Sequence, residues 1–114
     1  MKNRFIFIAA ALESIGLIQS YVDGYDLTEF LEDRRTQDAV VRNLEIIGQA
    51  LKDFGVEILL GQEPNMPWRQ IAGMRNVLAH EYLGVDIVMV WQTIQTHLNG
   101  LEDALEKILE QPNP

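Results

Sequence analysis

Apolar residues recur three and four positions apart along four segments, and this spacing is what most limits the fold of the chain. The segments span residues 5–18, 40–54, 71–78 and 90–108. Side chains spaced three and four apart lie on one face of an α-helix. The alternation typical of strands is weak throughout. The pattern therefore predicts an all-α protein made of amphipathic helices.

Turn and capping residues set the ends of the first two long helices. We expect the first helix over residues 2–22, with Gly24 after its end, and a short helical turn over 28–31. Thr36 suits the N-cap of the second helix because its hydroxyl can accept a hydrogen bond from a free backbone N–H. Gly55 stands where that helix should stop.

Similar signals organise the second half of the chain. A helical turn fits residues 56–60, and a loop follows over 61–67. Pro67 suits the first position of the third long helix, which we expect to reach residue 82. Asp86 then caps the fourth long helix. Short connections place neighbouring helices antiparallel, so we predict an antiparallel bundle of four main helices plus a short helical turn.

Length and composition limit the class of protein further. The chain has 114 residues, of which 47% are hydrophobic, so we expect one domain over residues 1–110 with a frayed tail at 111–114. It has no cysteine, which excludes disulfides and thiolate metal sites. The apolar run at 5–12 is too short to span a bilayer, and Glu13 interrupts it. We therefore expect a cytoplasmic protein with no membrane partner.

The net charge of −8 argues against a general nucleic-acid binder, which would normally be basic. Between Glu63 and Glu81, however, the chain has no acidic residue, and this window contains Arg69, Arg75 and His80. Such a window could bind RNA locally. The acidic remainder of the surface suits a cationic partner.

A short stretch of the third helix carries side chains suited to chemistry on a phosphodiester. Arg75 is followed by Asn76, His80 and Tyr82. Arginine keeps a positive charge that can hold phosphate, and histidine gains and loses protons near neutral pH. By spacing alone, most Arg-x4-His matches on a helix are solvated surface. The interpretation therefore depends on what surrounds the motif.

Helical geometry divides the motif between two sides of the helix. At about 100° per residue, Arg75 and Tyr82 lie at the edge of the core face, whereas His80 lies on the outward side. Three more residues share that outward side: Arg69, Gly73 and Asn76. A glycine inside a helix costs about 1 kcal/mol relative to alanine, and close approach of another helix or a phosphate would offset this cost. We predict a symmetric dimer through these three residues, which brings two Arg75/His80 sets into one cleft.

Arg42 and Glu45 form part of a polar stripe on the second long helix. By spacing alone, a surface ion pair worth a few tenths of a kcal/mol is the favoured interpretation. The functional interpretation is that Arg42 adds positive charge, and that Glu45 and Arg69 support the motif. His80 and His97 lack the spacing of metal ligands, so we expect no metal or cofactor.

Over nearly its whole length the chain resembles the HepT-like toxins of the HEPN superfamily. Their hallmark, Arg-x4-His-x-Tyr, is matched by Arg75, His80 and Tyr82, and the surrounding matches are residues 36–40, 42–48, 67–76 and 84–86, with Trp91. The resemblance implies an all-α HEPN fold and a homodimer with the motif at the dimer cleft. It also implies metal-independent RNA cleavage, and an MntA-like nucleotidyltransferase antitoxin that adds AMP to Tyr82.

The residue types agree with that activity. His80 could act as general base or acid on the 2′-hydroxyl, Arg75 could stabilise charge at the phosphorus, and Asn76 could orient His80 or contact phosphate. Two alternatives stay open. One is a non-catalytic helical dimer that binds a partner or a nucleotide. The other is a degenerate toxin retained for complex formation.

Overall fold

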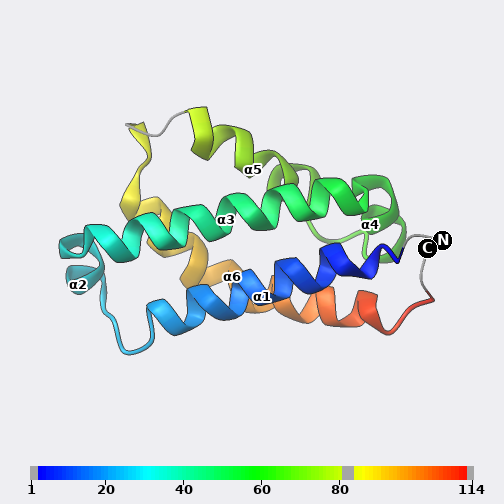
Figure 1. Ribbon diagram of the computed structural model, residues 1–114, viewed down its shortest axis with the longest axis horizontal. Helices are drawn as coiled ribbons and strands as arrows, with labels where there is room; N and C mark the ends of the chain where they lie inside the picture. Colours follow the sequence, from blue (N-terminus) through cyan, green and yellow to red (C-terminus); the bar gives the residue numbers. More distant parts are fainter. Residues whose placement is uncertain (1–2, 81–83, 113–114) are drawn as a thin grey trace.

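The computed structural model describes residues 3–80 and 84–112, and that part of the chain forms six α-helices without a strand (Figure 1). In chain order they are α1 (Phe5–Tyr21), α2 (Leu27–Glu32), α3 (Arg34–Phe54), α4 (Val56–Gln62), α5 (Trp68–His80) and α6 (Ile87–Leu109). The prediction of an all-α fold is confirmed. No helix within these residues is both long and apolar enough to cross a membrane.

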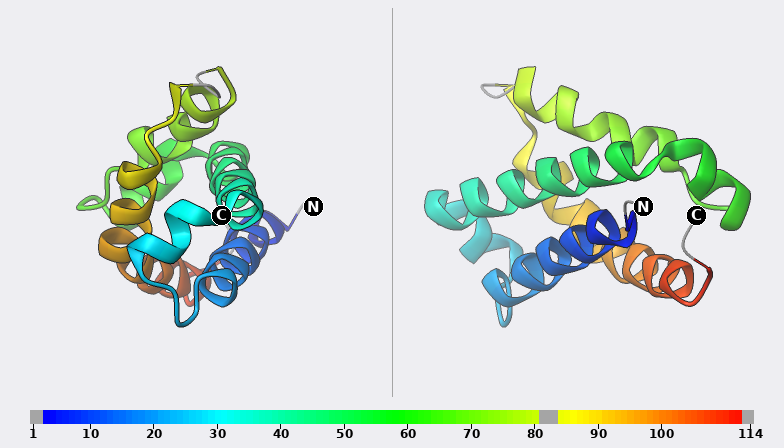
Figure 2. Two further views of the ribbon diagram at one scale, coloured as in Figure 1. Left: turned by 90° about the vertical axis from the view of Figure 1, so that its left-hand side faces the viewer. Right: turned by 45° about the vertical axis from the view of Figure 1, so that its right-hand side comes forward.

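Helix α3 lies at the centre of the bundle. It packs against α1 on one side and α5 on the other, while α6 packs against α1 and α2. Figure 1 shows the long helices α1, α3, α5 and α6 running alternately in opposite directions, as predicted. In both views of Figure 2, α5 lies at the edge of the bundle and α3 separates it from α1. One side of α5 therefore faces away from the rest of the chain.

The core is built from the apolar stripes that the spacing indicated. The large side chains with no exposed surface include Ile8, Ile15, Ile18, Val40, Ile47, Leu51, Phe54, Trp68, Leu105 and Ile108. The indole N–H of Trp68 donates to the carbonyl oxygen of Glu63 at 2.8 Å, which satisfies its polar atom inside the core. Trp91 packs against Phe30 with ring centroids 5.1 Å apart. Both tryptophans thus serve the core.

The start of α3 differs from the prediction. Its N-cap is Asp33, not Thr36: the carboxylate of Asp33 accepts hydrogen bonds from the backbone N–H of Thr36 at 3.0 Å and from its hydroxyl at 2.7 Å. The hydroxyl of Tyr25 donates to the same carboxylate at 2.6 Å. The hydrogen bonds from Tyr25 and Thr36 lower the pKa of Asp33 to about 2. An aspartate held this way caps better than the threonine three residues later.

Three other boundaries also shift. Helix α1 begins at Phe5, since residues 3 and 4 are not helical. The turn expected at 28–31 is the full helix α2, which a capping box between Asp26 and Glu29 starts. Helix α4 runs to Gln62, so the loop expected from Gly61 begins later. Short helices offer few periodic positions, which is why the spacing underestimated them.

Candidate functional site

Arg75 lies where the backbone of α5 rests directly on α3. A Cβ atom on Gly48 of α3 would lie 3.0 Å from the carbonyl oxygen of Ile71, 3.1 Å from the backbone nitrogen of Arg75 and 3.3 Å from its Cβ. A side chain at position 48 would push the two backbones apart. Gly48 therefore fixes how close the backbone of Arg75 lies to α3, and with it the position of the Arg75 side chain.

The side chain of Arg75 lines a groove of about 440 Å³ between α1, α3 and α5. Phe7 and Ala10 of α1, together with Ile46 and Ala50 of α3, give this groove an apolar surface. We call it the Arg75 groove. Its remaining lining residues are polar and come from α3: Arg42, Glu45, Gln49 and Asp53.

Arg75 has no carboxylate partner among the residues that the structure describes. Its Nη1 donates to Oδ1 of the neighbouring Asn76 at 3.3 Å, and both side chains are exposed. In contrast, Arg42 and Arg69 each form an ion pair with a glutamate. An exposed guanidinium held only by an amide can bind a phosphate without first losing a carboxylate partner.

Arg42 and Glu45 lie in the same groove as Arg75. Nη1 of Arg42 is 3.7 Å from Oε2 of Glu45; the Arg42 side chain is 71% exposed and that of Glu45 only 19%. At this distance, and with the arginine in solvent, the pair contributes little to stability, so Arg42 can exchange its partner at low cost. Both residues also line a second groove of about 470 Å³, which Val85 and Ile87 border just after the motif.

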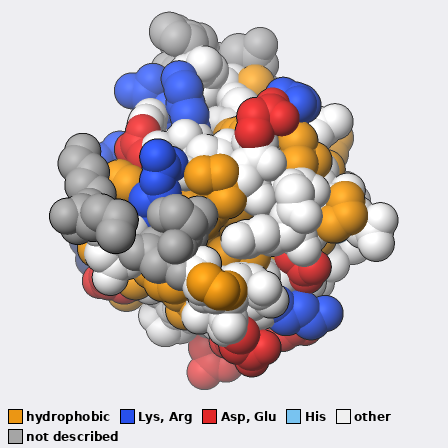
Figure 3. Space-filling model, turned by 90° about the vertical axis from the view of Figure 1, so that its right-hand side faces the viewer, with side chains coloured by type: hydrophobic (Ala, Val, Ile, Leu, Met, Phe, Trp, Pro, Cys, Tyr) orange, Lys and Arg blue, Asp and Glu red, His pale blue; other side chains and the backbone are white. Residues whose placement is uncertain are grey.

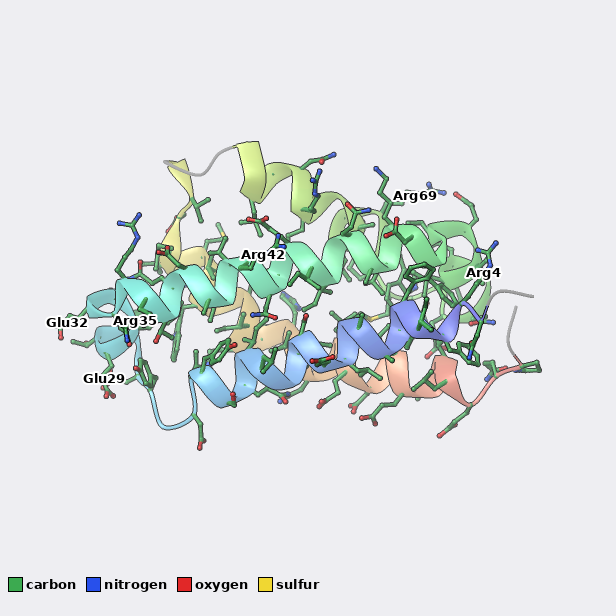
Figure 4. The ribbon with its side chains drawn as sticks, in the orientation of Figure 1. Arg4, Glu29, Glu32, Arg35, Arg42 and Arg69 are labelled. Carbon is green, nitrogen blue, oxygen red and sulfur yellow. The ribbon has the colours of Figure 1, made fainter. Side chains whose placement is uncertain are left out.

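Arg69 lies elsewhere. Its Nη2 donates to Oε1 of Glu57 in α4 at 2.7 Å, and both side chains are exposed. Figure 4 shows Arg69 at the α4 end of α5, whereas Arg42 lies partway along α3. The structure thus brings Arg42 and Glu45 to Arg75 but not Arg69, whose place in a dimer interface stays a prediction.

The outward side of α5 is open in the single chain. Gly73 and Asn76 are exposed, Val77 is 55% exposed, and a Cβ on Gly73 would meet no atom within 4 Å. No described helix therefore packs against Gly73 to compensate for the helix stability that a glycine costs. The dimer through this face remains a prediction.

The glycine that lets two helices touch is Gly48, which sequence reasoning did not single out. It lies one turn after Leu44 on the buried stripe of α3, and a glycine on a buried stripe is a signal for close helix contact.

The remaining motif residues are only partly defined. His80 is the last residue of α5, and its side chain, like Tyr82, lies outside the described residues. His97 is exposed on α6. Within the described ranges, no three histidine or acidic side chains gather as a metal site would require.

Charge is mixed over the surface that Figure 3 shows. This view faces the end of the molecule with α4 and the start of α1, where basic and acidic side chains are interspersed among apolar ones. Such a surface would attract nucleic acid only weakly over long range. The described side chains on this face therefore offer no continuous basic patch for nucleic acid (Figure 3).

The structure is an antiparallel all-α bundle with an exposed arginine on its outer helix, and this fold agrees with the bundle of HEPN type. The chain belongs to the ribonuclease HepT-like family, whose model matches residues 11–108.

Curated relatives agree with this assignment. A Thermococcus cleftensis protein named "Probable ribonuclease HepT" is 38% identical over 84% of this chain and 86% of its own length. "Putative RNase TTE0752" of Caldanaerobacter subterraneus is 34% identical over 97% and 98% of the two chains. The Methanocaldococcus jannaschii protein "Gamma-glutamylcyclotransferase and putative RNase MJ0434" is 34% identical over 96% of this chain, which spans about half (49%) of that relative. No solved structure matches the chain.

Proposed function

We propose that the protein is a metal-independent endoribonuclease that acts as the toxin of a toxin–antitoxin pair. The observation that carries this proposal is the state of Arg75: exposed, in a groove, and without a carboxylate partner among the described residues. The names of the relatives and of the family support ribonuclease activity. We also propose that the protein acts in the cytoplasm, where the toxin would meet cellular RNA.

The proposed reaction is an attack of the RNA on its own phosphodiester. His80 takes the proton of the 2′-hydroxyl, and the 2′-oxygen forms a bond to the adjacent phosphorus. The bond from phosphorus to the 5′-oxygen breaks, and this oxygen receives a proton from the partner subunit's His80. Arg75 stabilises the negative charge on the phosphoryl oxygens, and Asn76 orients His80 or contacts the phosphate. The products are a 2′,3′-cyclic phosphate and a 5′-hydroxyl.

A homodimer supplies the second histidine. The open side of α5, with Gly73, Arg69 and Asn76, is the surface proposed for the two-fold contact. The absence of any described neighbour around Gly73 supports this choice, because a second copy of α5 could approach there without a clash. A symmetric contact near the middle of α5 would place both motifs at one cleft.

Control by an MntA-like nucleotidyltransferase antitoxin completes the proposal. The hydroxyl of Tyr82 attacks the α-phosphorus of ATP, pyrophosphate leaves, and the tyrosine loses its proton to the medium. Tyr82 follows His80 by two residues, so an adduct there adds bulk and negative charge next to the motif. Its phosphate would compete with RNA for Arg75.

The test is an assay of the purified chain on RNA in the presence of EDTA, with the product ends mapped. We expect cleavage that survives EDTA and leaves 2′,3′-cyclic phosphates. Cleavage that needs a divalent ion, or that leaves 3′-hydroxyl ends, would overturn the mechanism. RNA or nucleotide binding without cleavage would instead indicate a binding dimer or a degenerate toxin.

A further inference from the structure

We propose that the Arg75 groove binds an unpaired nucleobase of the RNA, stacked on Phe7, next to the phosphate that Arg75 holds. The inference rests on the proposed ribonuclease function and adds to it a substrate class, single-stranded RNA, and a base preference. It follows from which side chains share the groove.

The groove combines an aromatic side chain with a phosphate-binding one. Phe7 of α1 is half-buried and packs against the core, yet it lines the same groove as Arg75 of α5. Proteins that recognise single-stranded RNA hold bases on aromatic rings and contact the backbone with arginine. The volume of about 440 Å³ lies within the range of small-molecule sites, about 300–1,000 Å³.

The side chains of Phe7 and Arg75 are held in a fixed relation. Helix α1 packs along α3, and α5 rests on α3 through Gly48. The two sides of the groove are therefore both fixed to one central helix. A site fixed in this way can discriminate between ligands by shape, because it need not be ordered when the ligand binds.

Hydrogen-bonding groups occupy the next part of the groove. Gln49 follows Gly48 directly on α3, and its side-chain N–H donates to Oδ1 of Asp53 at 2.9 Å. This bond holds the carboxylate of Asp53 one turn further along the groove. A carboxylate repels phosphate but accepts hydrogen bonds from the exocyclic amines of adenine, cytosine and guanine, a group that uracil lacks. The groove thus has a place for a phosphate at Arg75 and for an amine-bearing base near Asp53.

Base pairing is incompatible with this arrangement. In an RNA duplex the bases are stacked on each other and their edges are paired, so neither Phe7 nor Asp53 could reach its target. The site therefore selects unpaired RNA, and favours an amine-bearing base over uracil at the nucleotide beside the scissile phosphate.

Binding of the full chain to fluorescently labelled 2′-O-methyl oligonucleotides tests this proposal, because such RNA lacks the attacking hydroxyl. We expect tighter binding to oligo(A) and oligo(C) than to oligo(U) or to an A·U duplex. Phe7→Leu keeps an apolar side chain but removes the aromatic face, and should weaken binding to oligo(A) about tenfold. Ile6→Ala is the matched control: Ile6 is the neighbouring residue, 62% exposed, and does not line the groove.

Asp53→Ala tests the base preference separately. With this substitution, oligo(A), oligo(C) and oligo(U) should bind with similar affinities. The control Glu106→Ala removes an exposed acid on α6 and should leave the base preference unchanged. The same variants are compared for cleavage of unmodified oligonucleotides. If the wild type cleaves RNA but Phe7→Leu behaves as Ile6→Ala does, or uracil is bound as well as adenine, the groove proposal is wrong. A wild type that neither binds nor cleaves RNA would overturn the ribonuclease function itself.

Discussion

Gly48 and Arg75 are in contact through their backbones: a Cβ on Gly48 would lie 3.1 Å from the nitrogen of Arg75. Gly48→Ala should therefore destabilise the fold by about 1–3 kcal/mol and lower RNA cleavage, because α5 must move away from α3. Chemical denaturation measures the first effect. Gly100→Ala is the control, since nothing lies within 4 Å of its added methyl group; it should stabilise α6 by about 0.5–1 kcal/mol. Equal stability of both variants would contradict the close contact.

Gly73 tests the proposed dimer. Gly73→Leu places a large side chain in the middle of the open face of α5 and should reduce dimerisation, while far-UV circular dichroism stays helical. Light scattering gives the mass of each variant. Gly100→Leu, on another helix, should leave the dimer intact. A full dimer in the Gly73→Leu protein would move the interface to another surface.

Asp33 gives the fold a defined response to acid. Its pKa is lowered from 3.8 to about 2 in the folded chain, so its ionised form stabilises the fold above pH 3.8, and this contribution disappears as the pH falls to about 2. An asparagine in its place would still cap α3 but has no charge. The difference in urea midpoint between the wild type and Asp33→Asn should be constant from pH 7 to pH 5 and shrink below pH 4. A difference that persists unchanged to pH 2 would argue against the hydrogen bonds from Tyr25 and Thr36 as its cause.

The sequence predicts the long helices well, because they depend on local spacing, whereas the roles of the motif residues stay a prediction. The stripe from Val40 to Phe54 identifies α3, and the carboxylate of Asp86 accepts from the backbone N–H of Met89, as expected of a cap. Local spacing does not reveal which other helix each glycine contacts. Gly73 looked like a contact point and Gly48 did not, yet the close contact is at Gly48, because only the packing of α5 on α3 decides it. Phe7 and Arg75 are 68 residues apart in the sequence, and they line one groove because α1 and α5 both pack on α3.

Tyr82 tests the proposed control by AMP. Incubation with the nucleotidyltransferase partner, ATP and magnesium should add AMP to the wild type and stop RNA cleavage, because the adduct brings charge and bulk beside Arg75. Intact mass and peptide mapping follow the label. The Tyr82→Phe protein should remain unlabelled and active. Efficient labelling of that variant, or full cleavage by the labelled wild type, would refute the switch.

Cleavage of RNA by His80→Ala tests the central claim most directly. Loss of a general acid or base should lower the rate about 10²-fold or more, and Arg75→Ala should cause a loss of similar size. His97→Ala is the matched control, because His97 is the other histidine of the chain and lies exposed on α6. We predict that all three variants remain helical, and that only His97→Ala cleaves RNA at the wild-type rate. Wild-type cleavage by His80→Ala would contradict the account.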